Sequence, residues 1–324
     1  MPGALTLMDL HRRLGANDEI AKIIEILNET NDALDDVVWL EANMGTSHKS
    51  TTRTGIPEPA FRELNRGVKP TKSTTAQIVD HCAMLENYLE VDRDLADLSG
   101  NRNEFLLSES RPKIEGFKQK LMRTIFYGKK ADTKEFVGLT ERFNSKNAKS
   151  GENIIDAGGK TANKQTSIWL VGWSENTISG LYPKGSKAGM QLGPTKEETL
   201  TDSDGGLYEG IRKHFKWDCG LAVRDWRYAV RICNVDMPAV ISGALTADLI
   251  KYMIMASEQV PNEVPVKFSF YCNKHVRTAL RLQILNKQNV NLTFDTVAGK
   301  RVLAFDDIPV RRVDQLSTVE AVLG

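Results

Sequence analysis

The glycine-rich stretch Gly158–Thr161 (GGKT) is the part of the sequence closest to a phosphate-binding loop. Such a loop needs the spacing G-x-x-x-x-G-K-[ST], so that successive backbone N–H groups surround the phosphates. Ile154 stands where the first glycine belongs, and the residues that follow are polar rather than helix-forming. The sequence therefore favours a flexible turn over a nucleotide site.

Two acidic clusters carry groups that could bind a metal or transfer protons. Asp306 and Asp307 are neighbours, and neighbouring strand residues point to opposite faces, so a shared site would need an irregular backbone. Asp202–Gly206 (DSDGG) resembles the start of a calcium loop but lacks the rest of the twelve-residue ligand set. Turns explain both clusters better.

The cysteines and histidines show no ligand spacing either. No CxxC or mixed Cys/His pattern occurs, which favours reduced, buried thiols over a zinc or redox site. The scattered histidines are typical of surface or core positions, and the sequence contains no GxSxG, GxGxxG or HExxH motif. We therefore expect no enzyme, no cofactor and no metal. The residues concerned are Cys82, Cys219, Cys233, Cys272, His11, His48, His81, His214 and His275.

Basic and aromatic residues are interleaved at 212–217 and 224–231. Stacking platforms for nucleic acid have this composition, but so does an ordinary sheet with buried aromatic rings and arginines at its rim. The formal net charge of +1, from 43 Lys and Arg against 42 Asp and Glu, argues against a protein that coats nucleic acid. Structural packing is the favoured interpretation.

Length and composition limit the classes of protein to which these residues can belong. A chain of 324 residues makes one large or two medium domains, and 41% hydrophobic residues suffice for a packed core. The mean hydropathy is −0.34, and no apolar run approaches the roughly 18 residues of a membrane span. The N-terminus also lacks the apolar region of a secretory signal. We expect a soluble protein.

Hydrophobic periodicity predicts helices first and strands later, which is typical of an α+β fold. In the second helix, Ser110 followed by Pro112 resembles an N-terminal cap and first turn, and Gly128 should end the helix. If the helix instead begins near Arg102, Pro112 should kink it. A polar connector is expected at 144–166. The expected elements are an acidic amphipathic helix at 18–36, helices at 102–127 and 273–288, a buried strand at 167–173, a half-buried strand at 226–232, and strands at 266–270, 301–305 and 308–313.

The segment 41–75 is unusually polar. Only seven of its 35 residues are hydrophobic, ten are Ser or Thr, and six basic residues stand against three acidic ones. Such a segment cannot bury enough surface on its own chain to offset the entropy of ordering it, whereas its threonines suit paired strands. We predict a long arm or β-hairpin that projects from the body, with disorder as the alternative.

The order of these segments resembles the major capsid protein of tailed phages, in a branch found mostly in short-tailed phages. The resemblance rests on VVWLEANMG, TGIPEPAFRELNRGV, LEVDRDLADLSGNRNEFLLSES, TIFYG, EFVGLTERF, NIIDAGG, SIWLVGW, YPKGSKAG, FKWDCGLAVRDWRYAVRI and FYCNKHVRTALRLQ, and it covers about residues 15–315. It implies the α+β Hong Kong 97-type capsid fold with a central mixed sheet.

The resemblance also implies a division of the chain. By position, we expect an N-terminal arm at 1–37, an extended E-loop hairpin at 38–76, a peripheral domain with a long spine helix at 77–134, an axial domain at 135–265, and a helix and strands at 266–324 that return to the axial and peripheral domains.

Such proteins assemble into pentamers and hexamers that form an icosahedral shell around double-stranded DNA. The implied location is the virion, after synthesis in the host bacterial cytoplasm. Because the chain starts almost directly at the arm, we expect a separate scaffold protein; a portal, a decoration protein and non-specific DNA contacts complete the implied partners, with no membrane. The alternative is another self-assembling phage protein, either a compartment shell or a tail component.

Opposite charges on two segments suggest how copies could meet. The stretch 18–36 carries seven acidic residues against one basic residue, and the arm is basic. We hypothesise that the two engage neighbouring copies. The residues are Arg53, Arg62, Arg66 and Lys69 in the arm, and Glu25, Glu29, Asp32, Asp35 and Asp36 in the acidic helix.

Overall fold

The structure is a computed structural model that describes residues 32–324, except 133, 245, 262–265, 286–291 and 298–299. Within this part of the chain, 14 strands form one mixed sheet. The strands are β1 (Trp39–Glu41), β2 (Ser47–Gly55), β3 (Thr74–Asp92), β4 (Ile154–Asp156), β5 (Gln165–Trp173), β6 (Ile178–Tyr182), β7 (Gln191–Leu192), β8 (Lys196–Thr201), β9 (Leu207–Val223), β10 (Ala229–Asp236), β11 (Lys267–Cys272), β12 (Leu292–Val297), β13 (Lys300–Phe305) and β14 (Ile308–Arg312).

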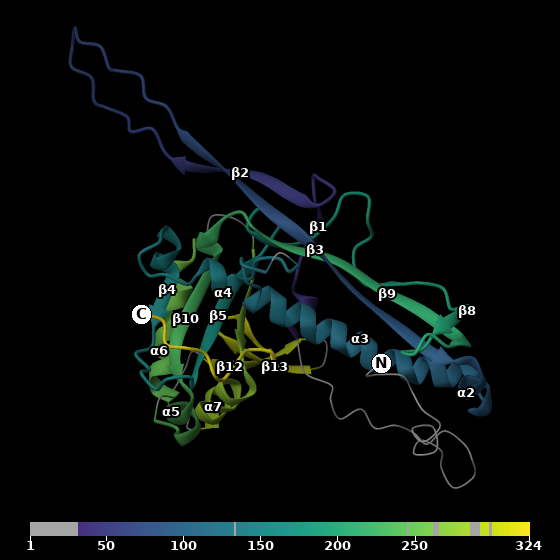
Figure 1. Ribbon diagram of the computed structural model, residues 1–324. Coiled ribbons are helices and arrows are strands. Elements are labelled where there is room, and N and C mark those ends of the chain that lie inside the picture. Colours follow the sequence, from purple (N-terminus) through teal and green to yellow (C-terminus); the bar gives the residue numbers. More distant parts are fainter. Residues whose placement is uncertain (1–31, 133, 245, 262–265, 286–291, 298–299) are drawn as a thin grey trace.

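The helices lie against the body of this sheet and along its extension (Figure 1). They are α2 (Arg93–Leu98), α3 (Arg102–Tyr127), α4 (Leu139–Arg142), α5 (Met237–Ser242), α6 (Thr246–Gln259) and α7 (Lys274–Leu285), with 3-10 turns η1 (Asp32–Asp35), η2 (Lys149–Asn153) and η3 (Trp226–Tyr228). The main path through the sheet is β12-β13-β14-β11-β5-β6-β9-β3-β2.

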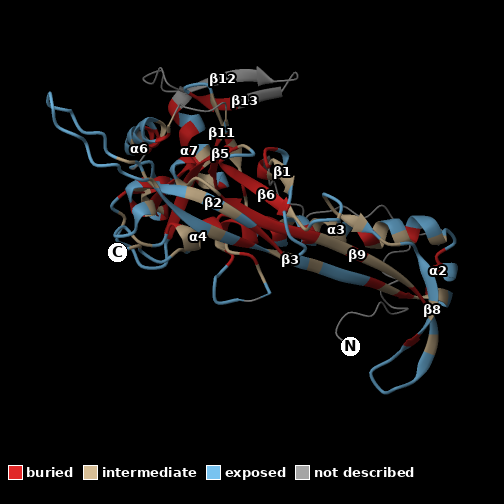
Figure 2. Cartoon of the chain, turned by 90° about the horizontal axis from the view of Figure 1, so that it is seen from above, coloured by how far each residue is buried: buried red, intermediate tan, exposed pale blue. Residues whose placement is uncertain are grey.

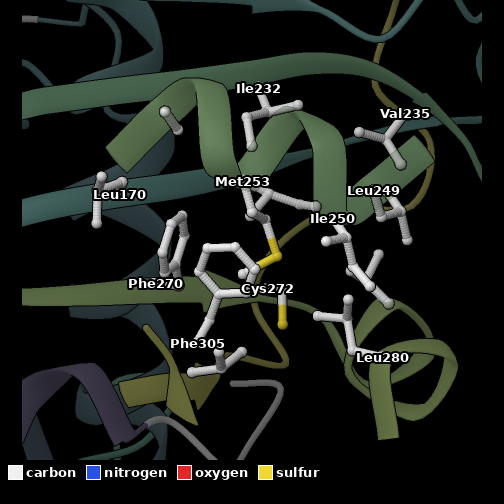
Figure 3. Packing of buried hydrophobic residues seen from close by; sticks show 14 of the residues in the cluster. Leu170, Ile232, Val235, Leu249, Ile250, Met253, Phe270, Cys272, Leu280 and Phe305 are labelled. Carbon is white, nitrogen blue, oxygen red and sulfur yellow. The ribbon is translucent and has the colours of Figure 1, made fainter. Parts of the chain in front are cut away.

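The centre of the body is β5, which is buried along its whole length. Ile168 and Leu170 face a core formed with α6 and α7, where Figure 3 shows Met253, Phe270 and Leu280 packed together. The alternate residues of β5 belong to a second core, formed with α3. Because successive strand residues point to opposite faces, coverage on both sides explains the uninterrupted apolar run.

The long helix α3 ends at the predicted position, but it begins at Arg102 and not at the cap predicted at Ser110 and Pro112. Asn101 caps its N-terminus by accepting a hydrogen bond from the backbone N–H of Glu104 at 3.3 Å, and Gly128 ends it. Pro112 lies inside the helix. The helix joins two cores, because Phe105 and Phe117 pack with β3 and β9 whereas its last two turns pack against the body.

The strands β3 and β9 pair antiparallel over eleven residues and extend far beyond the body. Leu89, Val91, Ile211 and Phe215 pack against α2 and α3, so the helices cover only one face of this extension. Figure 2 shows buried residues concentrated in the body and exposed residues along the arm and much of β3. The chain is therefore elongated.

The expectation of a half-buried strand at 226–232 is wrong. Its first residues form η3, and β10 is buried on both faces. Arg231, expected at a solvated rim, is only 4% exposed; its guanidinium lies 5.5 Å from the ring centroid of Trp169 and donates to the carbonyl of Phe143 at 2.9 Å. Arg231 alternates with apolar residues in the sequence, but it is a buried charge and does not belong to a solvent-exposed face of the strand.

The other expected elements are confirmed with small shifts. Strands occur at the three other expected C-terminal positions, and α7 follows Asn273, whose side chain caps it. Residues 154–156 form the short strand β4 within the expected connector, and α6 is an unpredicted helix. Of the predicted acidic helix at 18–36, residues 18–31 lie outside the described residues.

Candidate functional site

The stretches that could have carried catalysis are turns. Asp156 accepts a hydrogen bond from the N–H of Gly158 at 2.8 Å, which shapes the GGKT segment. Asp202 accepts from the N–H of Gly206 at 2.7 Å and closes the β8–β9 hairpin. Asp306 and Asp307 have φ values of 45° and 67° and join β13 to β14 as a two-residue turn. The expected turns are confirmed.

Three cysteine thiols are buried, as predicted. Burial raises the pKa of Cys219 and of Cys272 to about 12 and that of Cys233 to about 11, so these thiols stay protonated at neutral pH. Cys82 is half-buried, and burial raises its pKa to about 11. Among the described residues, no group of three or more His, Cys, Asp or Glu side chains is placed to hold a metal ion.

The structure confirms a projecting arm. It consists of β2, the start of β3 and the segment 56–73, which contains neither helix nor strand. Three apolar side chains near its end are almost fully exposed, with Ile56 at 88%, Phe61 at 107% and Leu64 at 88%. Figure 1 shows the arm leaving the body on the side away from α2 and β8. Exposed apolar groups gathered on one segment indicate a surface that binds a partner.

The arm's predicted basic residues all lie on this exposed surface. Arg53 is near the end of β2, and Arg62, Arg66 and Lys69 are in the segment beyond it. Arg66 forms an ion pair with Glu63 at 3.6 Å, and both side chains are more than three-quarters exposed. The other three form no ion pair within the described part of the chain, so their charges remain available.

The five acidic residues predicted to engage neighbouring copies differ in where they lie. Glu25 and Glu29 lie outside the described residues, as does the side chain of Asp32, while Asp35 is exposed. Asp36 has a different role from the predicted one, because its side chain is fully buried inside the subunit. It therefore cannot contribute to a charged surface.

Asp36 ties the beginning of the described chain to the sheet. Its carboxylate receives two hydrogen bonds from Arg311, both at 3.1 Å, and lies 2.7 Å from the ammonium of Lys267. The hydroxyl of Tyr271 donates to it at 3.0 Å and accepts from the indole N–H of Trp173 at 2.7 Å. Burial and the carboxylate raise the pKa of Tyr271 well above its usual value.

A second polar cluster holds the root of the arm. His48 on β2 faces Asp80 on β3, and Asp80 forms a 2.6 Å ion pair with Arg142. Arg224 Nη2 lies 2.9 Å from His48 Nε2, and the backbone N–H of Asn43 lies 3.3 Å from His48 Nδ1, so a neutral imidazole, which has one acceptor nitrogen, accepts only one of these two hydrogen bonds. The Thr52 hydroxyl donates to the Arg224 carbonyl at 3.1 Å. These contacts fix the direction in which the arm leaves the body.

The geometry at His48 predicts that packing of the arm root depends on pH. Burial and Arg224 lower the pKa of His48 below 6.5, although Asp80 acts in the opposite direction. The unfolded chain therefore binds more protons, so stability is fully present above about pH 6.5 and is lost as the pH falls toward the folded pKa. We expect protease cleavage within 49–55 to accelerate on acidification, and His48→Gln to remove most of that dependence. A variant with unchanged pH dependence would contradict this role.

The basic and aromatic clusters serve packing, as favoured. Arg212 pairs with Glu90 and Glu198 at 2.9 and 3.0 Å, and Phe215 is buried. On β10, Arg231 forms a 3.0 Å ion pair with Glu320 near the C-terminus. Neither cluster forms a row of unpaired Lys and Arg side chains among the described residues.

Glu320 joins three parts of the fold. Its carboxylate accepts from Arg231, from the hydroxyl of Ser167 at 2.6 Å and from that of Tyr127 at the end of α3. Its backbone N–H donates to the carbonyl of Gln165 on β5 at 2.9 Å. The segment also borders a cavity of about 870 Å³. Sequence reasoning missed Asp36 and Glu320 as anchors.

Comparisons with known proteins agree with this architecture. The profile of a family described as Major capsid protein GP7 matches residues 15–324. The solved structure of bacteriophage epsilon15 is 36% identical, with 99% of this chain and 98% of that chain covered and a TM-score of 0.80. No curated protein matches the sequence.

Two more distant structures are also similar. The capsid of bacteriophage JBD30 is 10% identical, with a TM-score of 0.49 over 90% of this chain and 92% of that one. The SrpI encapsulin of Synechococcus elongatus is 12% identical, with a TM-score of 0.45 over 72% and 97%.

The capsid-protein resemblance in the sequence is thus confirmed, as is the Hong Kong 97-type fold. No helix within the described residues has the length and apolar character needed to cross a membrane. The profile match and the likeness to epsilon15 together show that the chain belongs to the family of the major capsid protein GP7.

Proposed function

We propose that this capsid protein assembles into pentamers and hexamers of an icosahedral shell around double-stranded DNA, and that its role is structural rather than catalytic. The observation that carries the proposal is the projecting arm, whose apolar residues near its end are almost fully exposed, in a chain of a capsid family. In an isolated copy, no burial of apolar surface offsets the entropy that is lost when such a segment is ordered. Contact with a neighbouring copy can bury its apolar side chains. The location follows: the virion, after assembly in the host bacterial cytoplasm.

The division into domains is supported in part, because one core is formed mainly by α2, α3 and β3, whereas a second core joins residues of the arm, peripheral, axial and returning ranges. We propose the N-terminal arm at 1–37, the E-loop at 38–76, the peripheral domain at 77–134, the axial domain at 135–265, and the returning segment at 266–324. The core of α2, α3 and β3 also contains Ile211 and Phe215 from β9. The outer half of β9, with β8, therefore packs as part of the peripheral domain although it falls within the axial range.

The partners beyond the chain itself come from the resemblance. We propose a separate scaffold protein, a portal and a decoration protein, and weak, salt-dependent contacts with packaged DNA. The nearly balanced charge of the chain supports weak binding to phosphates rather than sequence reading.

Electron microscopy of the purified protein tests the shell. Closed spheres or rings of five and six copies are expected; tubes would favour a tail protein, and dispersed copies with turnover or tight DNA binding would contradict a shell. In the same assay, the arm variant Arg53→Glu, Arg62→Glu, Arg66→Glu and Lys69→Glu should assemble poorly. Assembly with unchanged yield and salt dependence would contradict the charge-based role of the arm.

A further inference from the structure

A basic patch lies near the C-terminal end of α3 and on the turn that follows this helix. Lys120 and Arg123 stand three residues apart, so they share one side of the helix, and together with Lys129 they border the cavity beside the C-terminal segment. Residues 120–135 carry five basic and two acidic side chains, a local charge of +3 in a chain whose net charge is +1. The basic patch consists of Lys120, Arg123, Lys129, Lys130 and Lys134.

Most of the charge of this patch is not compensated within the subunit. Lys120 forms an ion pair with Glu135, but the other four members are exposed and form none within the described part of the chain. The carboxylate of Asp132 accepts from the backbone N–H of Lys134 at 3.0 Å, and it can balance one charge at most. The helix dipole does not explain the patch either, because it favours cations in the last turn of a helix, and the last turn of α3 contains none.

The patch lacks the apolar groups that usually hold a protein partner or unpaired bases. Among the described residues of 120–135, no large apolar side chain is exposed, in contrast to the arm with its exposed Ile56, Phe61 and Leu64. Protein partners are normally held by apolar anchors, and single-stranded nucleic acid by aromatic rings that stack on its bases. Cations alone suit the phosphates of a duplex, which are bound through charge and without reading the bases.

The length of the patch matches several phosphates. An α-helix rises about 1.5 Å per residue, so about 12 Å of helix axis separates Lys120 from Gly128. Duplex DNA carries one negative charge per roughly 1.7 Å of its axis, so the same length of duplex carries about seven. The cations of the patch therefore meet phosphates at any position along a duplex, as a contact that does not depend on sequence requires.

We propose, on the basis of the shell function above, that the basic patch contacts the phosphates of the enclosed duplex DNA, so that this end of α3 faces the interior of the shell. Four uncompensated cations make a weak contact in one copy, and salt weakens it further because the contact releases counterions. It becomes effective when many copies present the same patch to one enclosed duplex.

Binding of a short DNA duplex to the unassembled full-length protein tests the patch. The patch variant should bind at least about tenfold more weakly at low salt, and the slope of log K against log salt concentration should become shallower by about 3–4, because each phosphate contact contributes about 0.9. The patch variant carries Arg123→Gln, Lys129→Gln, Lys130→Gln and Lys134→Gln.

The matched control removes the same charge from exposed positions outside the patch and should change the affinity and the slope much less. An equal loss in both variants would show that net charge governs binding, and no binding by the wild-type protein would exclude the contact. Either result overturns the proposal. The control carries Lys160→Gln, Lys187→Gln, Lys196→Gln and Lys251→Gln.

Particles assembled in the presence of the short duplex test whether the patch lies inside. Wild-type and control particles should retain duplex that a nuclease cannot reach, whereas patch-variant particles should form in normal yield and retain several-fold less. If the patch variant retains as much duplex as the control, the patch does not face the interior. If the patch variant alone fails to form particles, the patch contacts a neighbouring copy. Both outcomes contradict the proposal.

Competition with an acidic polypeptide separates duplex DNA from a protein partner. Extended polyglutamate carries one charge per roughly 3.3 Å, about half the charge density of the duplex, so it should displace a labelled duplex less effectively than unlabelled duplex does at the same concentration of charge. Stronger displacement by polyglutamate would assign the patch to an acidic protein surface and overturn the proposal. If the wild-type protein forms no particles but the patch variant loses duplex binding, the shell function fails while the patch stands.

Discussion

Glu320→Ala is expected to destabilise the subunit by about 3–5 kcal/mol, the usual cost of leaving one member of a buried ion pair without its partner. Arg231 is only 4% exposed, so its charge would remain largely buried beside Trp169 without its carboxylate partner. The hydroxyls of Tyr127 and Ser167 lose their acceptor as well. The loss should appear in equilibrium denaturation followed by tryptophan fluorescence.

Two further variants separate the cost of leaving the Arg231 charge unpaired from the cost of the lost packing. Glu320→Gln keeps an acceptor for the hydroxyls but removes the charge, so its cost should be intermediate. Arg231→Met combined with Glu320→Leu should recover most of the stability, because well-packed apolar residues often replace a buried ion pair without loss. If the double variant is as unstable as Glu320→Ala, the buried charge does not explain the effect.

The elements that sequence reasoning found share a strong local signal. The strand β5 contains an apolar run buried on both sides, and α3 ends at Gly128 as predicted, although Asn101 and not Ser110 caps its start. The arm was predictable because a segment with so few apolar residues cannot pack on its own chain. The spacing of Leu249, Ile250 and Met253 would also have indicated α6, so that omission was avoidable.

The remaining features depend on contacts between distant parts of the chain. Most of β3 beyond the arm is exposed or half-buried, and what holds it is pairing with residues more than 100 positions away on β9. Arg231 looked like a rim residue because α3, which covers the other face, is remote in sequence. Similarly, nothing near Asp36 in the sequence reveals Arg311, 275 positions away.

Asp36→Ala should have the second large effect, a loss of about 3 kcal/mol in the free energy of unfolding. The side chain is fully buried, and its removal leaves the Tyr271 hydroxyl, which is deeply buried, without an acceptor. The cost should be smaller than that for Glu320 because Arg311 and Lys267 are 27% and 52% exposed at their side chains, so water can solvate them. The expected fall in melting temperature is roughly 5 °C.

The matched control for Asp36 is Lys267→Ala, which removes the more exposed partner and should cost less than about 1 kcal/mol. Because Asp36 fixes the chain directly before β1, Asp36→Ala should also increase protease cleavage between residues 32 and 38 while the arm root at His48 is unaffected. A variant with wild-type melting and cleavage would show that Arg311 and Tyr271 find other partners. Increased cleavage at both places would instead indicate that Asp36 stabilises the whole subunit and does not act as a local anchor.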